Sequence, residues 1–439
     1  MWLRIKRILS NKTVMLRIAF TLGILAVVRI GSHITVPLFN AEAIREFMLN
    51  SGSFVAILNN FSGQALERFS ILALGISPYI TASIAVQLLQ MVIPQLKEWS
   101  EQGETGKQKL NRVTRYSAIV LAFLQAFALI IGISINGSVL RLDLEPALIT
   151  QYRYFFYIYM ALVMTAGTGL AIWLGDLITK KGIGNGTSML IVAGIVTSLP
   201  TMWTTLWSKY IQSPTRTGWD IVWFMIIILL YFGILFGVVY MQIATRKIPV
   251  QYANRQGKSD SNIPMKINSA GVIPVIFAST ILSIPLTLIG FGANANQTQG
   301  IVGWIKQIFD YQSPVGFILY VALIVVFSFF YAFLTIDPEK ISNNLSKSNA
   351  YIPGVRPGED TKNHIARLLF KITVIGTVYL VILAVLPIIT AIIFGFQGAE
   401  AQAITIGGTS LLIIVGVAIE TTNQVETDAS KAEYSGIFK

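Results

Sequence analysis

The feature that most constrains this chain is a series of apolar segments without a charged residue. Residues 221–241 and 317–336 are two such segments. An α-helix needs about 20 residues to cross roughly 30 Å of hydrocarbon. Only 12% of the residues are charged, whereas a soluble domain carries roughly a quarter. The sequence therefore predicts an integral membrane protein.

Ten membrane spans are predicted when hydropathy is averaged over about 19 residues. They lie near residues 15–34, 73–94, 116–135, 154–178, 186–205, 219–243, 269–290, 315–336, 368–394 and 404–421. An even number of spans puts both ends of the chain on one side. Most of the 33 Lys and Arg residues lie in the N-terminal segment, the loops after even-numbered spans and the tail. Basic flanks resist translocation, so we expect both termini in the cytoplasm.

Two short repeats relate the first five spans to the last five. Residues 75–80 and 271–276 share Gly-x-x-Pro-x-Ile, and residues 186–191 resemble 408–413. These pairs occupy spans two and seven, and spans five and ten. Five spans per half make the halves inverted in the membrane, an arrangement in which Gly/Pro-interrupted helices mark the central pathway. We predict an all-α fold of ten helices in two inverted halves around a central pore; chance similarity is the alternative.

The repeats single out four isoleucines, which are Ile80, Ile191, Ile276 and Ile413. If the two halves meet around one axis, these side chains converge there. A narrow apolar ring resists the passage of water and ions by dewetting. The alternative interpretation is that these isoleucines face lipid or an ordinary core.

A polar stripe runs along the second span. Ile76, Ile80, Ser83, Gln87 and Gln90 follow one another at helical spacing and share one face. Amide side chains are costly in lipid, so this face should look into protein or water. A simple interhelical hydrogen-bond seam is the alternative, and both interpretations hold if the seam can open. The preceding segment, 54–70, is too short to span; it predicts either an amphipathic surface helix or a re-entrant plug.

The sequence offers little chemistry. It contains no cysteine and two histidines, and no catalytic set or nucleotide-binding loop is visible. We expect no enzyme activity, metal site or cofactor. A secondary transporter of a small solute, also built of inverted repeats, is the alternative function; it is disfavoured because no span carries a carboxylate near its centre. The long basic segments 95–115, 244–268 and 337–367 either fix topology or receive an anionic partner.

The chain resembles the SecY family of protein-conducting channels. The matching motifs are residues 73–84, 182–186, 270–274, 351–358 and 407–412, in the family's order and spread over nearly the whole chain. The resemblance implies a clamshell of two halves, 1–205 and 206–421, around an hourglass pore, with a cytoplasmic tail at 422–439. It implies a channel that translocates unfolded secretory polypeptides across the bacterial plasma membrane and releases transmembrane segments laterally into the bilayer.

The resemblance also implies roles for individual residues. The pore ring would be Ile76, Ile80, Thr187, Ile191, Ile276 and Ile413, although Thr187 departs from the usual bulky aliphatic residue. The lateral gate, between spans two and three and spans seven and eight, would include Gln87 and Asn268. The plug would be residues 54–70, with Phe61, Ser62 and Gly63. Contacts to the motor ATPase SecA and to the ribosome would use Arg246, Lys247, Arg255, Lys258 and Arg356. Further expected partners are the SecE and SecG subunits, signal sequences, nascent polypeptides and membrane lipids.

Overall fold

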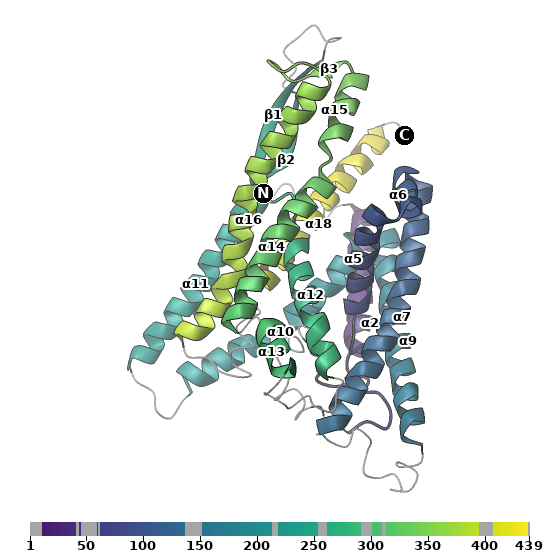
Figure 1. The fold of residues 1–439 in the computed structure, drawn as a ribbon, viewed down its shortest axis with the longest axis vertical. Coiled ribbons are helices and arrows are strands. Elements are labelled where there is room, and N and C mark those ends of the chain that lie inside the picture. Colours follow the sequence, from purple (N-terminus) through teal and green to yellow (C-terminus); the bar gives the residue numbers. More distant parts are fainter. Residues whose placement is uncertain are drawn as a thin grey trace.

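The chain is dominated by long helices (Figure 1). The structure, a computed structural model, describes residues 11–40, 44, 59, 62–136, 152–212, 218–252, 261–290, 301–309, 313–394 and 407–437. The helices are α2 (Lys12–Gly31), α5 (Ser77–Val92), α6 (Pro94–Glu101), α7 (Glu104–Asn136), α9 (Arg153–Lys181), α10 (Gly186–Tyr210), α11 (Gly218–Ile243), α12 (Ile273–Gly290), α13 (Ile301–Phe309), α14 (Pro314–Thr335), α15 (Pro338–Lys347), α16 (Glu359–Ile393) and α18 (Gly407–Ile437).

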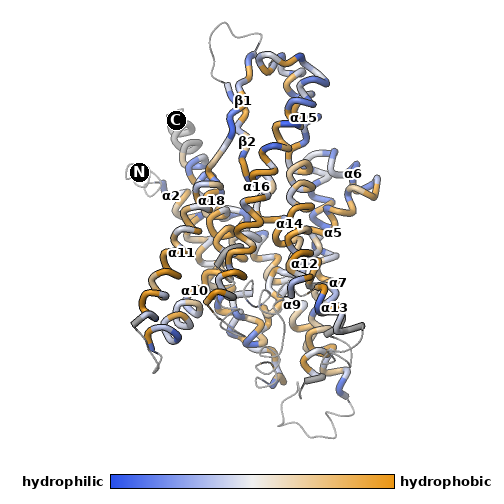
Figure 2. The backbone as a smooth tube through the Cα atoms, turned by 60° about the vertical axis from the view of Figure 1, so that its left-hand side comes forward, coloured by the Kyte–Doolittle hydropathy of each residue, from blue (hydrophilic) through white to orange (hydrophobic). Residues whose placement is uncertain are grey.

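Each of the ten predicted spans falls on one of these helices. In the described part of the chain, seven helices are long and apolar enough to cross a membrane: α2, α7, α9, α10, α11, α14 and α16. The pair α5 and α6, bent by 101° at their junction, makes up to eight. The predicted seventh and tenth spans fall on α12 and α18. Figure 2 shows many apolar residues along the helices and polar ones on β1 and β2.

The repeated sequence motifs are repeated in the backbone. Gly75 and Gly271 both have left-handed backbones, with φ of +53° and +67°. A proline follows in the first turn of each next helix, Pro78 in α5 and Pro274 in α12. Glycine tolerates positive φ, and proline suits a first helical turn. The shared Gly-x-x-Pro pattern therefore encodes a sharp turn directly into a helix at both places.

The long polar segments are folded. Residues of 244–268 form β1 (Thr245–Tyr252) and β2 (Ser261–Lys266), and β3 (Ala350–Tyr351) completes a three-stranded antiparallel sheet of order β2-β1-β3. The sheet and α15 lie together at one end of the molecule (Figure 1). Ile248 and Val250 of β1 pack in one cluster with Leu369 of α16. The expectation of an all-α chain is correct for the spans, but it missed the three-stranded sheet at this end.

The first turns of α2 and the last turns of α18 lie together. Arg17 Nη1 is 2.9 Å from Asp428 Oδ2, and the Gly184 N–H, between α9 and α10, donates to Gln424 Oε1 at 2.9 Å. Both helix ends therefore lie on one side, as an even number of spans requires. Residue 205, the expected boundary between the halves, lies inside α10, and residues 422–437 of the expected tail continue α18 as helix, with Val425 packed on Val14.

Candidate functional site

Five of the six predicted pore-ring residues meet in one apolar cluster. Ile76, Ile191 and Ile413 are buried, with exposed fractions of 5%, 9% and 4%, and Ile80 and Ile276 pack against them. They come from α5, α10, α12 and α18, two helices from each predicted half. The structure thus brings the four isoleucines of the repeat together in one cluster.

The sixth residue, Thr187, lies in the first turn of α10. Its hydroxyl donates to Asn185 Oδ1 at 2.7 Å, and its backbone N–H donates to the same oxygen at 3.1 Å. Asn185 is therefore the N-cap of this helix. Thr187 precedes Ile191 by one turn and shares its face of α10. The hydroxyl is satisfied by the cap, so it adds no unpaired polar group beside the isoleucines.

The polar stripe of α5 meets a partner that the sequence analysis missed. The phenol of Tyr331, on α14, donates to Gln87 Oε1, and Gln87 Nε2 is 3.3 Å from Ser83 Oγ. Tyr331 is 4% exposed and packs edge-on against Phe277 of α12, with ring centroids 5.2 Å apart. Tyr331 is one of two phenols in the otherwise apolar segment 317–336, and this was the available signal. We call the contact of α5 with α12 and α14 the gate seam.

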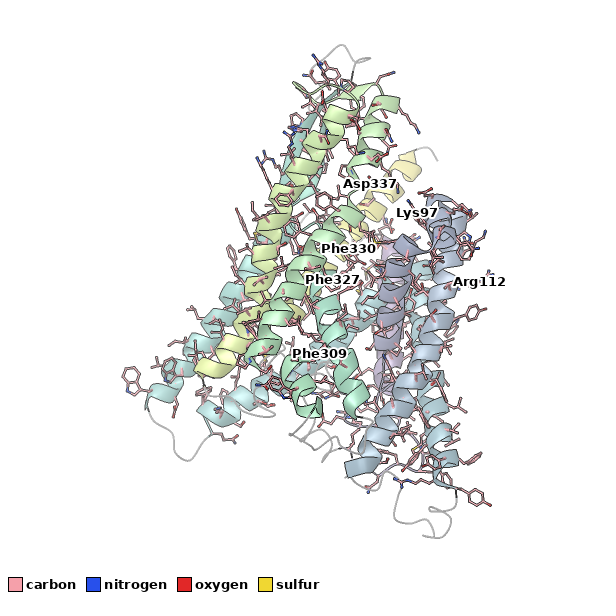
Figure 3. All side chains as sticks on the ribbon, viewed as in Figure 1. Lys97, Arg112, Phe309, Phe327, Phe330 and Asp337 are labelled. Carbon is pink, nitrogen blue, oxygen red and sulfur yellow. The ribbon has the colours of Figure 1, made fainter. Side chains whose placement is uncertain are left out.

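Apolar side chains surround this hydrogen bond. Phe327 and Phe330 lie on the side of α14 that faces α12 and α5 (Figure 3). Both belong to the cluster that contains Ile84 of α5 and Phe277. The gate seam therefore consists of apolar packing around a polar contact that joins the two predicted halves.

Asn268, the second predicted gate residue, is not bonded to Gln87. It is 5% exposed, and neither atom of its amide has a hydrogen-bond partner. It lies beside α16, where a Cβ on Gly376 would come within 2.8 Å of the Ile267 carbonyl oxygen. Gly376 thus allows the backbone before α12 to approach α16 closely. The structure joins Gln87 to Tyr331 rather than to Asn268.

The described part of the predicted plug is a series of tight turns. Ser62 Oγ donates to the Asn59 carbonyl at 3.0 Å and accepts the Leu66 N–H at 3.3 Å. Leu66 and Phe69 are almost fully buried, and Phe69 stacks on Phe39 with centroids 3.9 Å apart. This part is therefore not an amphipathic helix on the surface. Ser62 and Gly63 lie in it, whereas Phe61 is outside the described residues.

The predicted basic contacts lie at the end of the molecule that carries the sheet. Arg246 and Lys247 are exposed on β1, and Arg356 is exposed in the loop between β3 and α16. Arg255 and Lys258 are outside the described residues. The Arg356 loop is fixed by two hydrogen bonds: Thr361 Oγ1 donates to the Arg356 carbonyl and Ser342 Oγ to the Gly358 carbonyl, each at 2.8 Å.

A cavity and an ion pair lie next to the Arg356 loop. Arg356 borders a cavity of about 380 Å³ that is also lined by Asp360, His364 and Arg367. Lys362 Nζ lies 3.0 Å from Glu339 Oε2, which ties α16 to α15. The hydrogen bond to this carboxylate, with its negative charge, raises the pKa of Lys362. The helices before and after the Arg356 loop, α15 and α16, are therefore joined to each other.

Relatives resemble the chain over nearly its full length. A family model described as SecY matches residues 70–422. "Protein translocase subunit SecY" of Bacillus licheniformis is 42% identical, covering 100% of both chains. The protein of the same name from Staphylococcus aureus is also 42% identical, over 97% of each chain.

Solved structures share the fold. "The structure of a protein conducting channel" aligns with a TM-score of 0.60 at 17% identity, covering 93% of this chain and 91% of that one. "Sec61 in the Canine ribosome-channel complex from the endoplasmic reticulum" aligns with a TM-score of 0.57 at 16% identity and the same coverage. On the family model and the two relatives, this chain belongs to the SecY family.

Proposed function

We propose that this chain is the pore-forming subunit of a channel that moves unfolded secretory polypeptides across the plasma membrane and releases transmembrane segments sideways into the bilayer. Its relatives are named translocase subunits, and similar folds are protein-conducting channels. The observation that carries the proposal is the isoleucine cluster, because it joins four helices from both predicted halves. The comparisons do not favour a transporter of small solutes.

The isoleucine cluster would act as the seal. A narrow apolar constriction excludes water and ions. Apolar contact has no directional demand, so the same side chains can close around any residue of a passing polypeptide. For this role, Ile80 and Ile276 need only be apolar and able to move apart when a polypeptide passes. This explains why such a site can carry a broad range of sequences.

The gate seam would be the way out to lipid. A signal sequence that inserts between α5 and α12 must replace the apolar packing around Phe277 and break the hydrogen bond of Gln87 with Tyr331. A more apolar segment recovers more free energy from lipid and from the seam. The polar contact would therefore set how hydrophobic a segment must be to open the gate.

The end that carries the sheet would face the cytoplasm and receive the partners that drive transport. The structures with the same fold include the canine ribosome-channel complex and the "idle yeast Ssh1 complex bound to the yeast 80S ribosome". Exposed Arg246, Lys247 and Arg356 suit the phosphates of ribosomal RNA or an acidic face of SecA. We expect SecE and SecG as companion subunits in a bacterial plasma membrane.

Cysteine crosslinking tests the pore directly, since the chain contains no cysteine. Single cysteines at Ile80, Ile276 or Ile413 should crosslink to an arrested secretory chain that carries its own cysteine probe. Leu229→Cys on α11 is the matched control, because Leu229 is 75% exposed on the outside of the helix bundle. Crosslinks at the three isoleucines and none at Leu229 are expected. A pattern that favours Leu229, or no crosslink at any isoleucine in a well-expressed channel, would contradict a central pore.

A further inference from the structure

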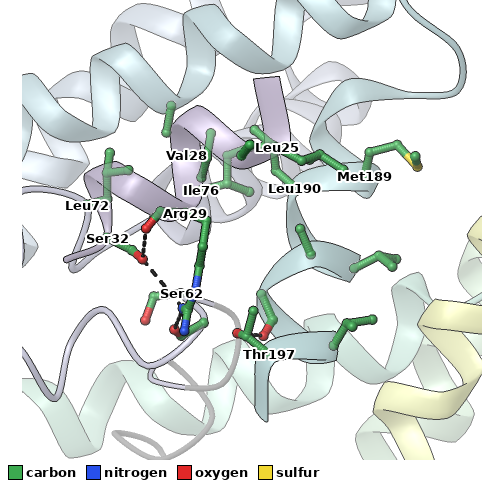
Figure 4. A pocket seen from close by; sticks show the side chains of 18 residues that line it. Leu25, Val28, Arg29, Ser32, Ser62, Leu72, Ile76, Met189, Leu190 and Thr197 are labelled. Atoms are coloured by element: carbon green, nitrogen blue, oxygen red, sulfur yellow. Dashed lines mark hydrogen bonds between the residues drawn. The ribbon is translucent and has the colours of Figure 1, made fainter. Parts of the chain in front are cut away.

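A cavity of about 420 Å³ lies between α2, α10 and the plug segment. Its lining is largely apolar, and Arg29 of α2 extends through it toward the turn at Ser62 (Figure 4). Arg29 belongs to the predicted first span, where an ionised side chain is costly unless it is paired with polar groups. The partners of this guanidinium therefore reveal what it does.

The main partner of Arg29 is the plug backbone. Arg29 Nη1 donates to the Gly63 carbonyl at 2.9 Å, and its contact with Ser32 Oγ is longer, at 3.5 Å. Among the described residues, no carboxylate pairs with Arg29. A hydrogen bond from a charged donor is among the stronger polar contacts in proteins. Arg29 can make this hydrogen bond only while the plug remains in this position.

Gly63 packs closely against α10. Its φ is +67°, and a Cβ would lie 2.9 Å from Thr197 Oγ1 and 3.1 Å from Gly194 Cα, both on α10. The next residue, Gln64, donates from Nε2 to Thr201 Oγ1 at 2.6 Å. The plug turn is thus held on one side by α2 and on the other by α10.

These contacts belong to one half of the molecule. The described hydrogen bonds of residues 62–70 with other elements go to Arg29, Thr201 and the connection after α2, all in the predicted N-terminal half. The apolar cluster around Leu66 and Phe69 draws on that half too. Separation of the halves at the gate seam therefore breaks none of them.

We propose that Arg29 is a positioning residue that latches the plug, so that release of the plug is a step separate from opening of the gate seam. Breaking the bond of Arg29 to Gly63 releases the turn from α2, while the gate seam is controlled by Gln87 and Tyr331. The inference rests on the proposed plug role of residues 54–70. A signal sequence must then supply free energy to two elements rather than to one.

Arg29→Met tests the latch in the complete channel complex reconstituted in lipid vesicles. Hydrogen exchange of the Gln64 and Leu66 amides should accelerate about tenfold or more, the usual effect of losing a hydrogen bond to a charged group. Amides of α14 should keep their rates, and ion efflux from the vesicles should rise. Arg153→Met is the matched control, because Arg153 lies at the start of α9 and bonds Tyr157 rather than the plug.

Two more variants keep the test decisive. Thr201→Val removes the acceptor of Gln64 on α10 and should loosen the plug by a smaller factor. If Arg29→Met does not accumulate, Arg29→Lys keeps the charge and shortens its reach, and the same acceleration is expected. Unchanged exchange at Gln64 and Leu66 in the Arg29 variant overturns the latch. Faster exchange without ion efflux supports the latch and refutes instead the proposed plug role of residues 54–70, on which the inference rests.

Discussion

The hydrogen bond across the gate seam gives the sharpest prediction. Tyr331→Phe removes the phenol oxygen that donates to Gln87 and leaves the ring that packs against Phe277. The apolar packing of the seam should therefore persist. Gln87 Oε1 loses its partner in the opposite half, so the closed state becomes less stable relative to the open one.

The size of the effect follows from the environment of the bond. Hydrogen bonds between membrane helices contribute on average about 0.6 and at most about 1.7 kcal/mol. The closed state should therefore lose about three- to eighteenfold in population relative to the open state. A leucine at the centre of a membrane segment contributes about 0.6 kcal/mol to insertion. Tyr331→Phe should thus lower the signal-sequence requirement by about one to three leucines.

The assay is export of a reporter behind signal sequences of graded leucine content, scored by the content that gives half-maximal export. Tyr320→Phe is the matched control on the same helix, since Tyr320 packs in a different cluster, with Leu380 of α16. Gln87→Leu and the double variant complete a cycle that isolates the coupling of Gln87 with Tyr331. An unchanged requirement in Tyr331→Phe, or effects of the two single variants that simply add, would refute the reasoning.

Three further outcomes are expected. Ile191→Asn buries an unpaired amide in the isoleucine cluster and should increase ion efflux from vesicles at rest; unchanged efflux would argue against a seal there. Gly63→Ala forces a side chain into positive φ at a cost of about 1–2 kcal/mol. It should speed hydrogen exchange of the Leu66 amide, and an unchanged exchange rate would contradict the prediction. Glu339→Gln should lower the pKa of Lys362, which NMR titration can follow. The ion pair stabilises the fold at pH values below the raised pKa of Lys362 and not above it. If the pKa of Lys362 is the same in Glu339→Gln, the ion pair does not form in solution.

The isoleucine cluster could be predicted from the sequence because its determinants are local. Gly75 and Gly271 are each followed by proline at the same spacing, and this pattern fixes a turn and a helix start without reference to the rest of the chain. Each isoleucine has a constant offset from its glycine. The cluster then follows from the symmetry of the two halves, and it required no knowledge of distant contacts.

The contacts across the fold could not be predicted in the same way. Gln87 and Tyr331 are 244 positions apart, and Arg29 meets a backbone carbonyl, which has no signature in the side-chain sequence. The sheet was missed for a different reason. Pro249 and Pro264 lie inside its strands, and proline usually argues against a strand because it cannot donate to the ladder. Here both prolines are exposed, so water can bond the backbone groups that they leave without a partner.

The sheet has a mechanical consequence. β1 begins two residues after α11 ends, and α16 runs unbroken for 35 residues from the sheet end into the bilayer region. Pro387 lies near its far end, and the 28 residues before this proline form a rod of about 42 Å. Both connections enter the predicted C-terminal half. We therefore expect a force on the sheet to reach that half first, with α16 as the lever arm.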